Sequence, residues 1–174
     1  PMLLQGKTAL ITGGTRGIGQ AIVKKFVEEG CQVAFTYVSS EGKAKQLETE
    51  LATSGIKVKA YKSDAGSYTD AEKLVDEVHK EFGAIDILVN NAGITRDNLI
   101  LRMGEEQWDE VIQANLKSVF NLTKHVSKIM LRQKSGSIIN LSSIIGEIGQ
   151  GGQANYAASK AGIIGFTKSI ADEF

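Results

Sequence analysis

The chain has 174 residues, of which 20 are basic, 20 are acidic and 42% are hydrophobic. This length suits one domain with a substantial core, and the balanced charge argues against a nucleic-acid or polyanion binder. The lone cysteine, Cys31, cannot form an intrachain disulfide, and we expect it to be buried at the start of a strand. His79 and His125 have no neighbouring ligands, so we expect both on helix surfaces and predict no metal site.

No apolar run approaches membrane-spanning length, and the N-terminus shows no signal peptide. We therefore expect a cytoplasmic protein.

Apolar runs that suit strands alternate with segments of helical periodicity. We expect strands over residues 7–12, 32–36, 57–62, 85–89 and 137–141, and helices over 18–29, 41–54, 67–82, 104–131 and 153–174. Ser67 and Asp70 form a capping-box-like start for the third helix, and a glycine-rich loop covers 146–152. The first, fourth and fifth strands are continuous apolar runs, which indicates burial on both faces. The sequence predicts an α/β, doubly wound and mostly parallel sheet that binds its ligand beyond the carboxyl ends of the strands.

A glycine-rich turn, residues 12–19, joins the first strand to the first helix. Its spacing is T-G-x-x-x-G-x-G, which differs from the common G-x-G-x-x-G fingerprint. Small residues let the backbone approach a pyrophosphate, and the helix N-terminus offers unpaired N–H groups and a partial positive charge. A tight connection without a ligand is the alternative, but the place of the turn between a first strand and a helix favours dinucleotide binding.

The end of the second strand bears on which nucleotide binds. An acidic residue there would accept both ribose hydroxyls of NAD and repel the additional phosphate of NADP. Residues 36–40 contain no acid before Glu41, and Arg16 is placed to reach the same ribose. We therefore predict NADPH rather than NADH.

Tyr156 and Lys160 are four residues apart in the last helix, so they share one face of it. Stabilising a phenolate at pH ~7 takes about 4 kcal/mol, which a positive charge at about 4 Å supplies at an effective dielectric of about 20. The pair therefore suits general acid/base catalysis, and Ser143 could hydrogen-bond the same substrate oxygen. On spacing alone, an amphipathic helix with a solvated lysine is the more common explanation.

These residues, with Asp64, residues 90–93 and Asn115, resemble the short-chain dehydrogenase/reductase family over the whole chain. Within it, residues 94–99 and 151–162 are similar to the 3-oxoacyl-[acyl-carrier-protein] reductases. The resemblance implies one Rossmann-type, NADP-binding domain over residues 1–174 that reduces a 3-oxoacyl thioester to the 3-hydroxyacyl thioester in fatty-acid biosynthesis. The alternatives are another ketone or acetoacetyl-CoA as substrate, or a dinucleotide-binding protein without catalysis.

The resemblance also assigns roles. Tyr156 would be the acid/base, and Lys160 would favour ionisation of its phenol and hold the nicotinamide ribose. Ser143 would position the substrate carbonyl, rather than its neighbour Ser142, and Asn115 would complete a proton relay through water. A solvated mid-helix residue is the alternative for Asn115. The implied cofactor-binding residues are Gly13, Thr15, Arg16, Gly17, Ile18, Gly19, Asp64, Ala65, Asn91, Tyr156 and Lys160.

Family members continue beyond the last helix with further strands and a substrate-covering helix, so the resemblance implies a chain truncated at Phe174. Members commonly form homotetramers through two long helices that this chain contains, and we expect at least a dimer. An acyl carrier protein is acidic, so a basic patch should receive it. The candidates are Lys128, Arg132, Lys134 and Lys168, with ordinary solvated helix ends as the alternative.

Overall fold

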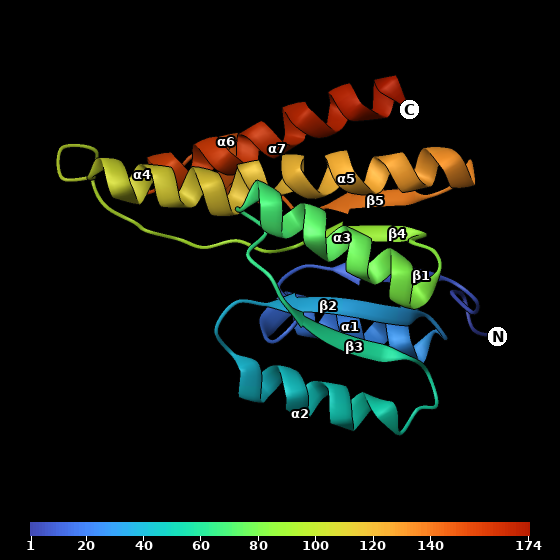
Figure 1. The fold of residues 1–174 in the computed structure, drawn as a ribbon. Helices are drawn as coiled ribbons and strands as arrows, with labels where there is room; N and C mark the ends of the chain where they lie inside the picture. Colours follow the sequence, from blue (N-terminus) through green and yellow to red (C-terminus); the bar gives the residue numbers. More distant parts are fainter.

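The computed structural model describes residues 1–174, and five parallel strands form its central sheet (Figure 1). The order across the sheet is β3-β2-β1-β4-β5. The strands are β1 (Thr8–Ile11), β2 (Gln32–Tyr37), β3 (Val58–Lys62), β4 (Ile87–Asn90) and β5 (Ser137–Asn140). The chain reverses its direction across the sheet between β1 and β4, and ligands bind at such a switch point, beyond the carboxyl ends of the strands.

The helices are α1 (Gly17–Glu28), α2 (Glu41–Ala52), α3 (Tyr68–Phe82), α4 (Glu105–Ile112), α5 (Ser118–Gln133), α6 (Ile145–Ile148) and α7 (Ala154–Glu173), with a π-helical segment η1 (Gln113–Lys117) between α4 and α5. The short helix α6 lies inside the expected glycine-rich loop and was not predicted. The hydroxyl of Ser67 accepts the N–H of Asp70 at 3.2 Å. The Asp70 carboxylate instead accepts the N–H of Asp64, so only half of the expected capping box forms.

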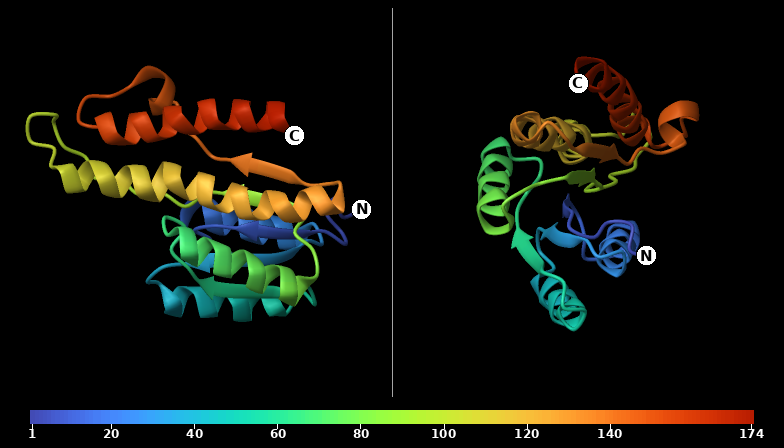
Figure 2. Two further views of the ribbon diagram at one scale, coloured as in Figure 1. Left: turned by 45° about the horizontal axis from the view of Figure 1, so that its top comes forward. Right: turned by 90° about the vertical axis from the view of Figure 1, so that its right-hand side faces the viewer.

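Each face of the sheet has its own hydrophobic core, because side chains alternate along a strand. Leu10 and Leu88 pack with α3 and α5, whereas Ile11 and Val89 pack with α1 and α2. Figure 2 shows these helix pairs on either side of the sheet, with α7 beyond α5. Cys31 is fully buried, as expected, immediately before β2. None of the helices combines the length and apolar character needed to cross a membrane.

Two expectations about burial were wrong. β1 and β4 are buried along their whole length, but β5 alternates between exposed and half-buried positions, and Ile139 is 43% exposed. The reason is that β5 pairs with β4 alone and forms an edge of the sheet. His125 lies between α3 and α5 with 5% of its surface exposed, not on a helix surface, because the Tyr68 ring covers it at 4.8 Å between ring centres.

Candidate active site

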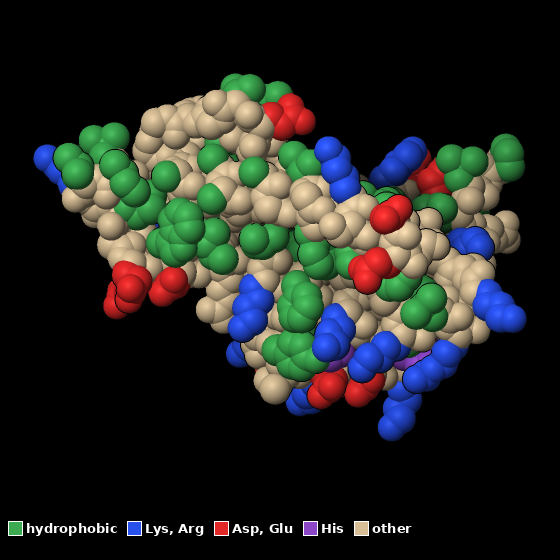
Figure 3. Space-filling view, turned by 90° about the horizontal axis from the view of Figure 1, so that it is seen from above, with side chains coloured by type: hydrophobic (Ala, Val, Ile, Leu, Met, Phe, Trp, Pro, Cys, Tyr) green, Lys and Arg blue, Asp and Glu red, His purple; other side chains and the backbone are tan.

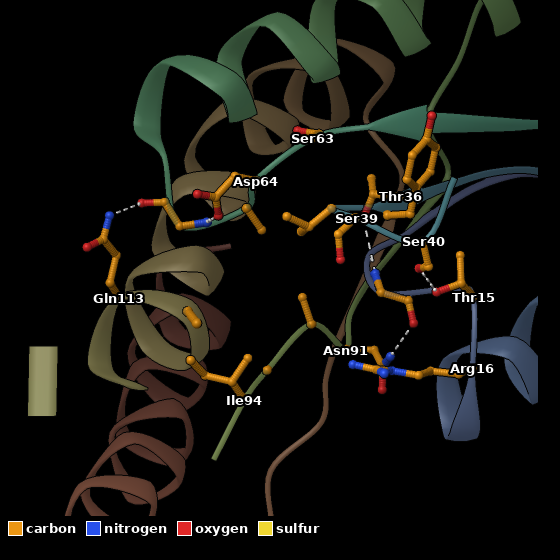
Figure 4. Close-up of a pocket in the computed structure, with 18 of the residues that line it drawn as sticks. Thr15, Arg16, Thr36, Ser39, Ser40, Ser63, Asp64, Asn91, Ile94 and Gln113 are labelled. Atoms are coloured by element: carbon orange, nitrogen blue, oxygen red, sulfur yellow. Dashed lines mark hydrogen bonds between the residues drawn. The ribbon is translucent and has the colours of Figure 1, made fainter. Parts of the chain in front are cut away.

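A cleft of about 600 Å³ opens at the carboxyl ends of β1 to β4 (Figure 4). It is lined from one side by the glycine-rich turn and from the other by the segments after β3 and β4 and by η1. Six of the predicted cofactor-binding residues line it: Gly13, Thr15, Arg16, Asp64, Ala65 and Asn91. The topology thus brings together residues from three separate strand ends.

The glycine-rich turn is shaped to admit a phosphate group. Gly13 and Gly17 have φ of 69° and 57°, a conformation that side chains disfavour. A Cβ on Gly19 would overlap the carbonyl oxygen of Gly13, so the first turn of α1 packs directly on the strand end. No side chain caps this helix at Arg16, which leaves its first N–H groups free for an anion. The turn therefore fits the pyrophosphate of a dinucleotide.

Asn91 and Thr12 lock the end of β4 to the glycine-rich turn. The Thr12 hydroxyl accepts the N–H groups of Asn91 and Ala92, both at 3.0 Å. The Asn91 amide donates to the carbonyls of Thr12 and Gly13 at 3.2 and 3.0 Å. These bonds fix the backbone of the cleft floor.

The end of β2 forms another wall of the cleft with hydroxyl groups and no carboxylate. The Thr36 hydroxyl accepts the Gly13 N–H at 3.1 Å, and the hydroxyls of Thr15 and Ser40 lie 2.9 Å apart. Arg16 extends from the start of α1 into the cleft (Figure 4). An additional phosphate on the ribose would therefore meet a cation and hydroxyls at this wall.

The Asp64 side chain is engaged at the opposite wall, where its Oδ1 accepts the Gly66 N–H at 2.9 Å. Gln113 donates to the Gly66 carbonyl at 3.1 Å, and Asn121 donates to the Ala65 carbonyl at 2.9 Å. Two amides from the long helical region thus hold the turn after β3.

Lys160 is buried, with 6% of its surface exposed, and its Nζ lies 5.6 Å from the centre of the Tyr156 ring. The ammonium donates to the Leu141 carbonyl at 3.2 Å. Burial lowers the pKa of Lys160 from its ordinary value. The two side chains meet on one helix face as the spacing predicted, although the ammonium lies over the phenol ring.

Asn115 is fully buried in η1, not solvated. Its Oδ1 accepts the Ile94 N–H at 2.7 Å, and its Nδ2 donates to the Ile94 carbonyl at 3.0 Å and to the Ser159 hydroxyl at 3.2 Å. A Cβ on Gly93 would lie 3.1 Å from Asn115 Oδ1 and 3.7 Å from Lys160 Nζ. Because Gly93 also lines the cleft, the Lys160 ammonium lies just behind its inner end.

The two candidate serines differ in their partners. The Ser142 hydroxyl donates to the Lys160 carbonyl at 2.7 Å, which ties the end of β5 to α7. The half-buried Ser143 hydroxyl only accepts, from the Ile145 N–H at 3.2 Å. Its own proton is therefore left to donate to a ligand.

The other predicted residues lie outside the cleft lining. These are Gly17, Ile18 and Gly19 of the glycine-rich turn and all four predicted catalytic residues, Asn115, Ser143, Tyr156 and Lys160. Conversely, Gly93 and Gln113 line it and were not predicted. Gly93 could have been found, since it closes the polar run that follows the fourth strand. Gln113 carried no such signal, because its inward position depends on the π-helical turn.

Comparison with known proteins agrees with this geometry. The sequence model of the family described as short chain dehydrogenase matches residues 7–174. The chain is 49% identical over 167 residues to the 3-oxoacyl-[acyl-carrier-protein] reductase FabG of Staphylococcus aureus, covering 96% of this chain and 68% of that protein. It is 46% identical over 172 residues to the protein of the same name from Salmonella typhimurium, covering 99% of this chain and 69% of that one.

Proposed function

This chain belongs to the short-chain dehydrogenase family, and we propose that it reduces the ketone of a 3-oxoacyl thioester, carried by acyl carrier protein, to the 3-hydroxyacyl thioester of fatty-acid biosynthesis. The observation that carries the proposal is the buried Lys160 ammonium between the Tyr156 ring and the inner end of the cleft. When bound, a reduced nicotinamide supplies the hydride for the keto carbon. The names and identities of the relatives support the choice of substrate.

The residues around the carbonyl would share the proton chemistry. Tyr156 gives its phenolic proton to the substrate oxygen, and the Lys160 ammonium stabilises the phenolate that remains. Ser143 donates a hydrogen bond to the same oxygen as charge develops on it. Asn115 belongs to the proposed proton relay. Since its side chain is already bonded to Ile94 and Ser159, a relay through this residue would use its backbone carbonyl.

We propose NADPH as the preferred cofactor. Arg16 and the hydroxyl of Ser40 lie at the wall formed by the end of β2, where no carboxylate stands to repel a ribose phosphate. The proposal keeps the predicted roles of Asp64 and Ala65 at the adenine and of the glycine-rich turn at the pyrophosphate.

Three further properties belong to this proposal. Acyl carrier protein would dock on basic residues of α5 and α7, and the protein would act in the cytoplasm. It would form at least a dimer through its long helices, and a monomer in light scattering at micromolar concentration would contradict that association.

The test follows NADPH consumption with an acetoacetyl thioester, by this chain and by its Tyr156→Phe variant. We expect the variant to lose roughly 100-fold or more of kcat, the contribution typical of a positioned general acid, while its affinity for NADPH stays within about twofold. NADH run in parallel should give a much lower kcat/KM. Equal turnover by both proteins would contradict the role of Tyr156, and equal efficiency with both cofactors would contradict the NADPH preference.

A further inference from the structure

Asn155, the residue before Tyr156, is fully buried although it is polar. Its amide Nδ2 donates to the Arg96 carbonyl at 2.9 Å and to the Gln107 carbonyl at 3.1 Å. Its Oδ1 accepts the N–H of Tyr156 at 2.8 Å. One side chain therefore bonds to the loop after β4, to α4 and to the backbone of Tyr156.

These bonds matter because the start of α7 has no ordinary cap. Gln153 is the N-cap residue and makes no side-chain capping bond. The first N–H groups of a helix lack partners within it, and Tyr156 lies in this first turn. Asn155 supplies the missing acceptor for the Tyr156 N–H. It does so from inside the helix, with its own position fixed by two carbonyls of other segments.

The other hydrogen bonds between these segments are exposed to solvent or lie ahead of the first turn of α7. Gln153 donates to the Asp97 carboxylate at 3.2 and 3.3 Å, but this pair is exposed to solvent. The backbone N–H of Asn98 donates to the Gly152 carbonyl at 2.9 Å, ahead of the helix. Further along α7, the Ser159 hydroxyl donates to the Tyr156 carbonyl at 2.7 Å. Tyr156 is thus held at its carbonyl by Ser159 and at its N–H by Asn155.

We propose that Asn155 is a positioning residue that sets the rotation of the first turn of α7, and so the place of the Tyr156 hydroxyl relative to Lys160 and Ser143. This inference rests on the proposed function. Asn155 acts through the backbone of Tyr156 and touches no reacting atom. Losing its two donors releases the helix start from Arg96 and Gln107. A displacement of about 1 Å of a reacting group can cost roughly 100-fold in rate.

The test uses Asn155→Ala, which removes all three bonds, and Asn155→Asp, which keeps the acceptor for Tyr156 but loses both donors. The matched control is Asn98→Ala, which removes a half-buried amide side chain of the same loop. This amide donates to the Arg102 carbonyl at 3.1 Å and to Gln107 Oε1 at 3.4 Å, and it makes no side-chain bond to α7. We expect both Asn155 variants to lose roughly 10- to 100-fold of kcat, with the KM for NADPH within about twofold. Asn98→Ala should behave like the parent chain.

A second readout needs no turnover. The chain contains four tyrosines, so fluorotyrosine labelling gives four fluorine resonances, and Tyr156→Phe identifies the one from Tyr156. We expect Asn155→Ala to move this resonance and to leave the other three in place. A general loss of folding would move all four. If Asn155→Ala does not fold, the Tyr156 resonance is measured in the isosteric variant Asn155→Asp instead.

The outcomes separate this inference from the proposed function. No turnover by the parent chain would contradict the function, and the fluorine spectra would still decide the role of Asn155. An unmoved Tyr156 resonance in the folded Asn155 variants would overturn the inference. So would a kcat equal to that of Asn98→Ala, or a fall in kcat matched by an equal rise in the KM for NADPH.

Discussion

At the scale of single residues, the site depends on polar groups that are buried and largely bonded. Burial disfavours the charged form of Lys160 and so lowers its pKa. The hydrogen bond to the Leu141 carbonyl and the contact with the Tyr156 ring favour the charged form. The four-residue spacing predicted that Tyr156 and Lys160 would meet. It could not predict the burial, because the loops that cover Lys160 come from distant parts of the sequence.

His125 is a buried titratable group outside this site, and it gives a prediction about pH. Its Nε2 has no hydrogen-bond partner. Burial lowers the pKa of His125 from the ordinary value of 6.5. The positive charges of Lys124 and Lys128 lower this pKa further, whereas the negative charges of Glu72 and Asp76 raise it. Below about pH 6.5 the unfolded chain binds a proton at this residue before the folded chain does, so stability falls as pH falls.

We therefore expect His125→Gln to cost about 1 kcal/mol at neutral pH, from the lost ring contact with Tyr68, and the cost to shrink as pH falls below 6.5. Urea unfolding of both proteins between neutral and mildly acidic pH measures the difference. His79→Gln, which retains His125, should keep the pH slope of the parent chain. A cost for His125→Gln that is the same at every pH would contradict this prediction.

At the scale of helices and strands, the sequence predicted most elements but not the irregular ones. The alternation of apolar runs and helical periodicity indicated the five strands and the major helices. A four-residue helix such as α6 is too short for periodicity to reveal. In the π-helical turn η1, Asn115 and Gln113 hydrogen-bond to segments that are distant in the sequence, and a local pattern does not reveal such contacts. His125 did carry a signal, since it lies three residues after the buried Leu122 and four before the buried Ile129.

The contact between α6 and α7 holds the Ser143 loop against Lys160, and glycine makes it possible. A Cβ on Gly146 would lie 2.7 Å from the backbone N of Ala161 and 2.8 Å from the backbone C of Lys160. A Cβ on Gly165, also in α7, would meet nothing within 4 Å. Replacing these two glycines by alanine should therefore change the stability of the protein in opposite directions.

We expect Gly146→Ala to destabilise the protein by roughly 1–3 kcal/mol through overpacking against backbone, and to lower kcat because Ser143 moves. Gly165→Ala should stabilise it by up to ~1 kcal/mol, since alanine is the better helix former. Denaturant midpoints of the two variants test both signs. A neutral Gly146→Ala would mean that α6 can shift away from α7 without loss of stability.

At the scale of the whole molecule, the net charge of zero hides an uneven distribution. Figure 3 shows Lys and Arg side chains gathered toward the right-hand side of the face seen from above. The exposed Lys124, Lys128 and Arg132 on α5, with Lys134 just after it, follow one helix, and Lys168 is exposed on α7. Such a cluster suits an acidic partner better than the balanced composition suggested.

If acyl carrier protein docks there, reversing two of these charges should weaken the binding of the carrier-bound substrate and leave the binding of a small substrate unchanged. We expect Lys128→Glu with Arg132→Glu to raise the KM for the carrier-bound thioester roughly tenfold at low salt, because steering by exposed charges is lost. The KM for a small thioester should not change, since it gains nothing from the patch. The control reverses the charges of Lys24 and Lys25 on α1, which lies on the other side of the sheet. These lysines form exposed ion pairs with Glu50 and Glu28, and such pairs contribute little to stability. Equal effects on both substrates, or an equal effect of the α1 control, would show that the basic residues of α5 are only a solvated helix face.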